Sequence, residues 1–181
     1  MKTNLTFSSI LIIAILCGCT SKSTSPKNEM TPASYSYSFS SEKQIVAFYD
    51  TSAYDTTRRI KIDYGNNVVF QYQYQREQNN NITDDEYSEG LVFEIASNID
   101  SFRLTNAFLD SSSCYFGRFC FCYSPGWQIV DSGYLLGTKI NDSVWHVTAN
   151  LVANIVLQKY VDTTIAERKN IQIDALFMKI N

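Results

Sequence analysis

The acidic segment 84–89 holds the side chains best suited to metal or acid–base chemistry. Its carboxylates are Asp84, Asp85, Glu86 and Glu89. We interpret the segment as a solvated loop without a bound metal or cofactor. A calcium site is the alternative, since Ca²⁺ prefers several oxygen ligands, although the order differs from that of an EF-hand. A glycosidase would need two carboxylates about 5–10 Å apart across a cleft, and the second would come from Asp50, Asp55 or Glu94.

Cys114, Cys120 and Cys122 form a second group of reactive side chains, but C-x5-C-x-C lacks the two-residue spacing of zinc sites. In a regular strand Cys120 and Cys122 would lie about 6.7 Å apart with parallel Cβ vectors, which suits a disulfide poorly. A tight turn centred on Gly117 would set Cys114 opposite Cys120 at about 4.5–5.5 Å, a distance that a disulfide bridges. A turn shifted by one residue would select Cys122, and free thiols in the core are the other alternative.

His146 is the only histidine, so a reaction that depends on histidine has one candidate. Because it alternates with Trp145 and Val147, it should face outward from its strand. The nucleophile-elbow motif G-x-S-x-G does not occur in the sequence. We therefore expect that the protein is not an enzyme, with a hydrolase that uses the acidic segment as the alternative.

Tyr123 and Trp127 flank the turn signal Pro125-Gly126 and are the candidate binding residues. Aromatic rings on the loops of a sheet protein can stack on sugars or peptides. The alternative is a buried tryptophan that anchors the core.

Alternation of apolar and polar residues from Tyr35 onward predicts the strands that position these groups. The segment 68–75, VVFQYQYQ, has apolar side chains at every even position and mostly polar ones between them. One buried and one wet face are typical of an antiparallel sheet. We predict an all-β fold, an antiparallel β-sandwich of about eight to ten strands with immunoglobulin-like or jelly-roll-like topology. Its expected core includes Phe70, Tyr72, Leu91, Phe93, Trp145, Val147, Ile173 and Phe177.

The charge of the chain argues against one class of partner. Its 181 residues include 15 Lys and Arg against 18 Asp and Glu, a formal net charge of −3. No block of basic residues occurs, so we expect no binding to nucleic acid.

The N-terminus has the layout of an export signal. Lys2 precedes the apolar run from Leu5 to Leu16, which is about a dozen residues long, whereas a membrane span needs roughly 20. The run ends in Leu16-Cys17-Gly18-Cys19, which resembles the lipobox of bacterial lipoproteins. The resemblance implies that Cys19 receives a diacylglyceryl group, that the peptide is cut before it, and that its amino group is acylated. An ordinary signal peptide, a membrane span and cleavage before Cys17 are the alternatives.

These observations divide the chain into a signal peptide (1–18), a lipidated Cys19 with a flexible Ser/Thr/Pro-rich tether (19–34), and one β-sandwich domain (35–181). Thr20 is not the aspartate that marks retention in the inner membrane of many lipoproteins, which favours the outer membrane. The sequence therefore predicts an envelope lipoprotein held by the lipid on Cys19. Its domain would bind or scaffold an envelope protein or a glycan.

Replacing the lipidated cysteine tests the anchor. We expect Cys19→Ser to abolish incorporation of labelled palmitate and to leave an uncleaved precursor, because the acceptor thiol is lost. Cys17→Ser is the matched control and should be labelled normally. Palmitate on Cys19→Ser together with its absence from Cys17→Ser would place the lipid on Cys17 instead.

Overall fold

The computed structural model describes residues 30–50, 57–82, 85–106, 108–109, 112–120, 126–159 and 164–180. The predicted signal peptide and Cys19 lie outside these residues, so lipidation stays a prediction. No helix in the described part of the chain is long and apolar enough to cross a membrane.

The described residues form ten strands and confirm the all-β prediction. The strands are β1 (Met30–Thr31), β2 (Ser34–Asp50), β3 (Thr57–Gln75), β4 (Gln78–Asn79), β5 (Tyr87–Ala96), β6 (Ser101–Thr105), β7 (Tyr115–Cys120), β8 (Trp127–Asn141), β9 (Val144–Lys159) and β10 (Thr164–Lys179).

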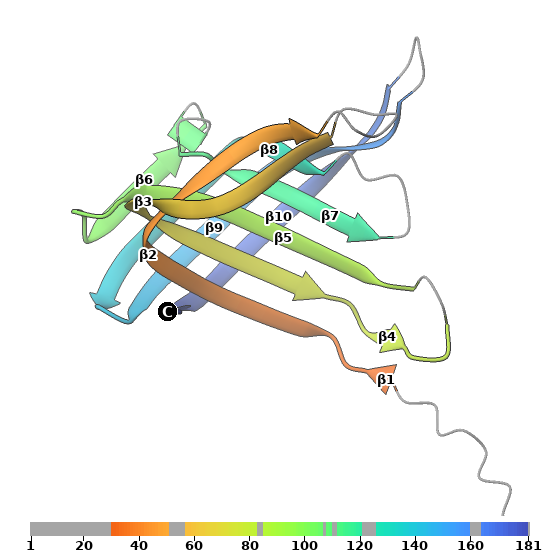
Figure 1. Cartoon of the computed structure of the whole chain (residues 1–181), viewed down its shortest axis with the longest axis horizontal. Coiled ribbons are helices and arrows are strands. Elements are labelled where there is room, and N and C mark those ends of the chain that lie inside the picture. The colour runs from red at the N-terminus through yellow and green to blue at the C-terminus, as the bar shows by residue number, and fades with distance from the viewer. Residues whose placement is uncertain are drawn as a thin grey trace, which may run out of the picture.

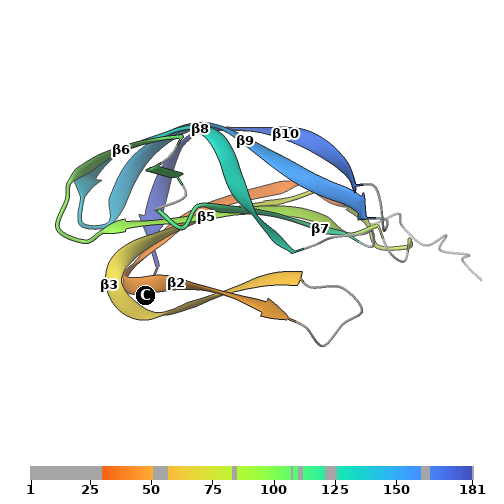
Figure 2. The same cartoon turned by 90° about the horizontal axis from the view of Figure 1, so that it is seen from above.

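Eight of these strands form one sheet in the order β6-β8-β7-β5-β3-β2-β10-β9, and β8 also pairs with β9 (Figure 1). All these pairings are antiparallel except a short parallel contact in which Met178 and Lys179 of β10 meet Ser38 and Phe39 of β2. Seen from above, β6, β8, β9 and β10 form one layer, and β5 and β7 belong to the layer below it (Figure 2). The arrangement is sandwich-like, as predicted.

Aromatic side chains fill the space between the two layers. The ring of Phe70 lies 4.7 Å from that of Phe93, 5.5 Å from that of Trp145 and 5.6 Å from that of Phe177, measured between centroids. All eight residues expected in the core are buried. The alternation along β3, β5, β9 and β10 therefore identified the inner face of each strand correctly.

The hairpin of β2 and β3 bends sharply partway along its length. The backbone of Glu42 is left-handed (φ 57°), and the β2–β3 register shifts around Lys43. Beyond this point, residues 43–50 of β2 and 57–64 of β3 form a two-stranded extension, which we call the arm. Figure 2 shows the arm folded back beneath β5 and β7, as a third layer.

The arm covers part of the face that alternation predicts to be wet. Val69 and Val92 point away from the main core, yet their exposed fractions are 0% and 3% because Ile45 of the arm packs against them. Partly buried side chains surround this second core, namely Ile60, Ile62, Tyr115 and Trp127. The sheet therefore has apolar contacts on both faces near the arm.

The predicted disulfide between Cys114 and Cys120 is wrong. Gly117 lies inside the continuous strand β7 rather than in a turn, so six residue steps separate the two cysteines. At about 3.3 Å per step they are roughly 20 Å apart, far beyond the 7 Å limit between Cα atoms for a disulfide. Cys114 is a buried free thiol, whereas Cys120 is disulfide-bonded.

Strand pairing begins before residue 35. Met30 and Thr31, placed in the tether by composition, pair with Asn79 and Gln78 of β4, and β2 already begins at Ser34. Backbone pairing can order a polar segment that has no apolar pattern of its own.

The two cysteines should differ in reactivity. Burial raises the pKa of the Cys114 thiol above its ordinary value, because an apolar environment disfavours the thiolate. We expect iodoacetamide to spare Cys114 in the folded protein and to modify it in urea, with Cys120 unmodified until a reductant is added. Peptide mass mapping checks both sites, and rapid labelling of native Cys114 would contradict its burial.

Candidate functional site

A groove of about 390 Å³ lies on the outer face of the lower layer, beside the arm. The apolar side chains of Ile60 and Ile62 on the arm line it on one side. Phe119 of β7 and Trp127 of β8 also line it. A concave site with apolar walls and a few polar groups is the usual form of a ligand site.

The floor of the groove is polar and comes from residues that alternate with the core. Ser36 and Ser38 of β2 alternate with the inward-facing Tyr37 and Phe39, and Gln71 and Gln73 of β3 alternate with Phe70 and Tyr72. Each hydroxyl and each amide can both donate and accept hydrogen bonds. The alternation that buries the aromatic side chains therefore also presents these groups on the opposite face.

One cross-strand row runs through the site. Ser36 pairs with Gln73, Gln73 with Gly90, Gly90 with Gly117 and Gly117 with Trp127. Directly paired residues project to the same face of a sheet. The row thus places a hydroxyl, an amide, two bare glycine backbones and an indole side by side across β2, β3, β5, β7 and β8.

The two glycines of the row determine where the indole lies. A Cβ atom at Gly90 would come within 2.8 Å of Cη2 of Trp127, and one at Gly117 within 3.1 Å of Cε3. The ring therefore extends from β8 across β7 to β5 over strands that carry no side chain there. Phe119 packs edge-on against it, with centroids 5.3 Å apart. Trp127 is half-buried and combines the two roles expected as alternatives, since it packs in the second core and lines the groove.

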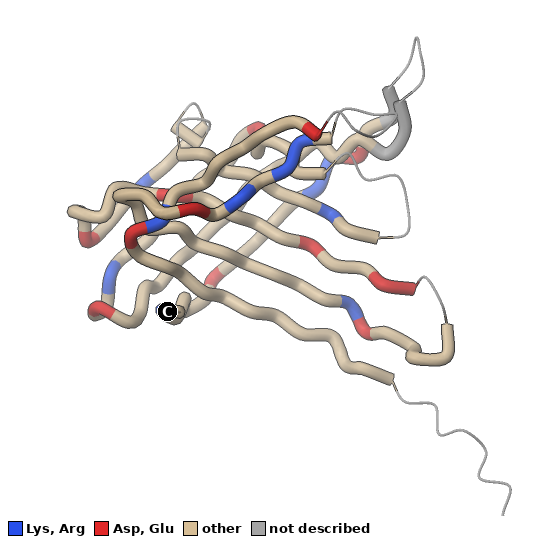
Figure 3. Tube along the Cα trace, viewed as in Figure 1, with Lys and Arg blue, Asp and Glu red and all other residues tan. Residues whose placement is uncertain are grey.

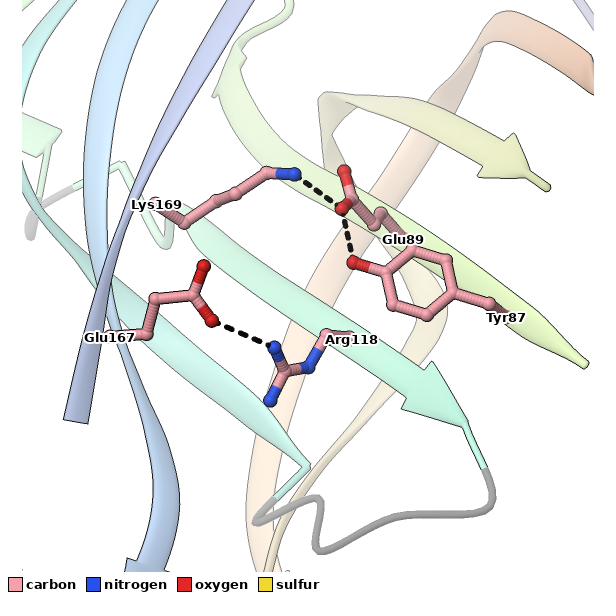
Figure 4. A network of polar contacts seen from close by, with 5 residues as sticks. All are labelled: Tyr87, Glu89, Arg118, Glu167 and Lys169. Carbon is pink, nitrogen blue, oxygen red and sulfur yellow. Dashed lines mark hydrogen bonds and ion pairs between the residues drawn. The ribbon is translucent and has the colours of Figure 1, made fainter. Parts of the chain in front are cut away.

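Glu89 also borders the groove, but its carboxylate is engaged on the inner face of the sheet. Lys169 of β10 binds its Oε1 atom at 2.5 Å, and the hydroxyl of Tyr87 donates to the same atom at 2.5 Å (Figure 4). Arg118 of β7 pairs with Glu167 of β10 at 3.2 Å beside it. Burial, with the hydrogen bond to Glu89 and its charge, raises the pKa of Tyr87, so the phenol keeps its proton. The network joins the two layers, and the positive charge of Lys169 compensates the negative charge of Glu89.

The other carboxylates singled out in the sequence have separate positions. Asp85 accepts a hydrogen bond from the backbone N–H of Asn79 at 2.7 Å, and Glu86 is exposed. Asp84 lies outside the described residues. Among the residues that the structure describes, no group of three or more His, Cys, Asp or Glu side chains could hold a metal ion. The structure therefore does not bring Asp85, Glu86 and Glu89 together as a calcium site.

The candidates for a second carboxylate are likewise engaged. Glu94 accepts a hydrogen bond from the backbone N–H of Ile45 at 2.7 Å and so fastens the arm to β5. Asp50 pairs with Arg59 across the arm at 3.8 Å. Charged residues of the arm are visible as blue and red segments in Figure 3. Asp55 lies outside the described residues.

His146 faces outward, as its alternation with Trp145 and Val147 predicts. Its Nε2 atom lies 2.7 Å from Oδ1 of Asp174 on the neighbouring strand β10, and both side chains are largely exposed. This is a pair on the solvent face, away from the lining of the groove.

Of the residues that line the groove, sequence reasoning singled out Trp127 and Glu89 and missed the others. Tyr123, its proposed companion, lies outside the described residues. Two signals were present in the sequence: serines alternating with aromatic residues in 34–40, and single glycines inside the strand patterns at 90 and 117. An isolated glycine in a strand often marks a close approach by another group, and here that group is an indole.

Comparison with protein-family models, curated proteins and solved structures finds no match to this chain.

A double-mutant cycle tests the contact between Gly90 and Trp127. Gly90→Ala should destabilise the wild-type protein by about 1–3 kcal/mol, because the methyl group meets the indole. In a Trp127→Ala background the same change should be neutral or stabilising by about 0.5–1 kcal/mol, because alanine is the better strand residue. Urea unfolding measures all four proteins. Equal destabilisation in both backgrounds would mean that the indole does not lie over Gly90.

Proposed function

We propose that the chain is a membrane-anchored envelope lipoprotein whose folded domain is a non-catalytic binding module. The observation that carries the binding role is the groove, in which the hydroxyl of Ser36, the amide of Gln73 and the indole of Trp127 lie on one cross-strand row. A ligand would enter between the arm and Trp127. The partner would be a component of the cell envelope, either protein or glycan.

The anchor in this proposal rests on the sequence around Cys19. Two or three acyl chains on one cysteine hold a protein firmly on a bilayer, whereas a single chain binds only marginally. Thr20 favours the outer membrane over the inner. The lipid on Cys19 would keep the groove close to ligands at the membrane, at a height set by the segment before β1.

The absence of catalysis in this proposal is supported by the positions of the carboxylates. A general acid or a nucleophile must reach the substrate with a free carboxyl group. Glu89 forms an ion pair with Lys169, and Glu94 accepts a hydrogen bond from the backbone of the arm. Each therefore has a structural role that a hydrolase would have to give up.

Blocking the groove tests the proposed function and does not require an identified ligand. Protein, lipid and polysaccharide fractions of a bacterial envelope are titrated against the protein while tryptophan emission is recorded, because Trp127 lines the groove. Ser36→Tyr puts a ring on the exposed floor and should abolish the change caused by the active fraction. Ser101→Tyr, at an exposed position of β6, is the matched control and should respond like wild type.

Two results would contradict the proposal. One is a wild-type protein whose emission no fraction alters. The other is a Ser36→Tyr variant that binds the active fraction as well as Ser101→Tyr does. Thermal unfolding of both variants establishes that the fold is retained.

A further inference from the structure

We infer that the ligand of the groove is a neutral glycan, bound with one sugar ring against Trp127 and its hydroxyl groups on Gln73 and Ser36. This inference rests on the proposed function and specifies the class of ligand. Three properties of the groove support it: the charge of its lining, the strand pairing of the backbone beneath it, and the order of side chains along the cross-strand row.

The lining offers no counter-charge to an ionic ligand. Among the described residues that line the groove, Glu89 is the one with a charged side chain, and its carboxylate points to Lys169 on the inner face (Figure 4). The floor is made of hydroxyl and amide groups. A phosphorylated, sulfated or basic ligand would lose hydration without gaining an ion pair, which is unfavourable. A neutral ligand has no such cost.

The backbone of the central floor is already paired. β3 pairs with β2 on one side and β5 on the other, and β5 pairs with β3 and β7. A peptide that adds as a strand needs unpaired N–H and C=O groups at a sheet edge. β3 and β5 offer none beneath the groove, because each is paired on both sides, whereas β2 meets β10 only at Ser38 and Phe39. Side chains must therefore provide recognition, which favours a ligand that carries many hydrogen-bonding groups of its own.

The order of groups along the row fits the two sides of a sugar ring. The tip of the indole lies over Gly90, and Gln73 is the paired residue on the next strand, about 4.8 Å away. A pyranose has apolar C–H faces that suit an aromatic surface and a rim of hydroxyl groups that both donate and accept. The amide of Gln73 and the hydroxyl of Ser36 match that rim, because each also does both. Further sugar units would follow Ser38 and Gln71 along the floor.

Binding of the full chain to an array of neutral and acidic oligosaccharides, together with uncharged Gly/Ser peptides, tests the inference. We expect binding to a neutral glycan that 0.5 M NaCl leaves unchanged, since salt screens only charged contacts. Calorimetry on that glycan should show a loss of about tenfold or more for Trp127→Ala, because the stacking contact is removed. Gln73→Ala should also weaken binding, whereas Trp127→Phe should retain part of it.

Phe48→Ala is the matched control, because Phe48 is 48% exposed on the arm and is not part of the lining. Preferential binding of an acidic glycan or a peptide would overturn the inference, as would a neutral glycan that Trp127→Ala binds normally. If Ser36→Tyr blocks a protein or lipid fraction and no glycan binds, the glycan assignment fails and the groove remains a binding site. If nothing binds in either experiment, both proposals fail.

Discussion

The packing of Phe70 between the two layers is the contact on which the rest of the structure depends. Its ring touches aromatic partners from both sides of the sandwich, including Phe93 of its own layer and Trp145 of the other. Aromatic side chains bury large areas and prefer such stacked and edge-on geometries. Phe70 also fixes the orientation of β3, because a shift of one residue would turn its whole apolar set to the other face. Gln71 and Gln73 face the groove as a consequence.

The groove itself results from a bend in one hairpin and from two glycines in neighbouring strands. The bend at Glu42 folds the arm back so that Ile45 covers Val69 and Val92, and this forms one side of the site. The glycines at 90 and 117 leave room for Trp127 to lie across two strands. The bend interrupts the β2–β3 ladder, whereas the glycines remove side chains from strands that stay regularly paired. The packing of the second core compensates for the apolar contacts that are lost. The buried network of Glu89 and Lys169 holds β5 to β10 close to this region.

Part of the candidate site could be predicted from the sequence. Trp127 stood out because a large aromatic residue follows a Pro-Gly turn, and the outward direction of His146 followed from alternation. The partners of Trp127 were not readable, because a glycine inside a strand pattern is compatible with a turn, a bulge or a close approach. Gly117 lies inside strand β7, so the predicted turn at this residue is wrong. The predicted disulfide between Cys114 and Cys120 depended on that turn and is wrong for the same reason.

Local patterns were enough to predict the all-β fold and the inner faces of β3, β5, β9 and β10, because side-chain alternation is a local property with a period of two residues. In β8 the buried side chain is Leu135, whereas Tyr134 and Ile140 are exposed. The sequence also set the acidic segment apart and provided the lipobox-like N-terminus. The strand order, the bend of the β2–β3 hairpin and the row from Ser36 to Trp127 could be established only from the three-dimensional structure. These depend on contacts between residues far apart in the chain. Local patterns cannot choose among such contacts, because packing and backbone pairing select the register between distant strands.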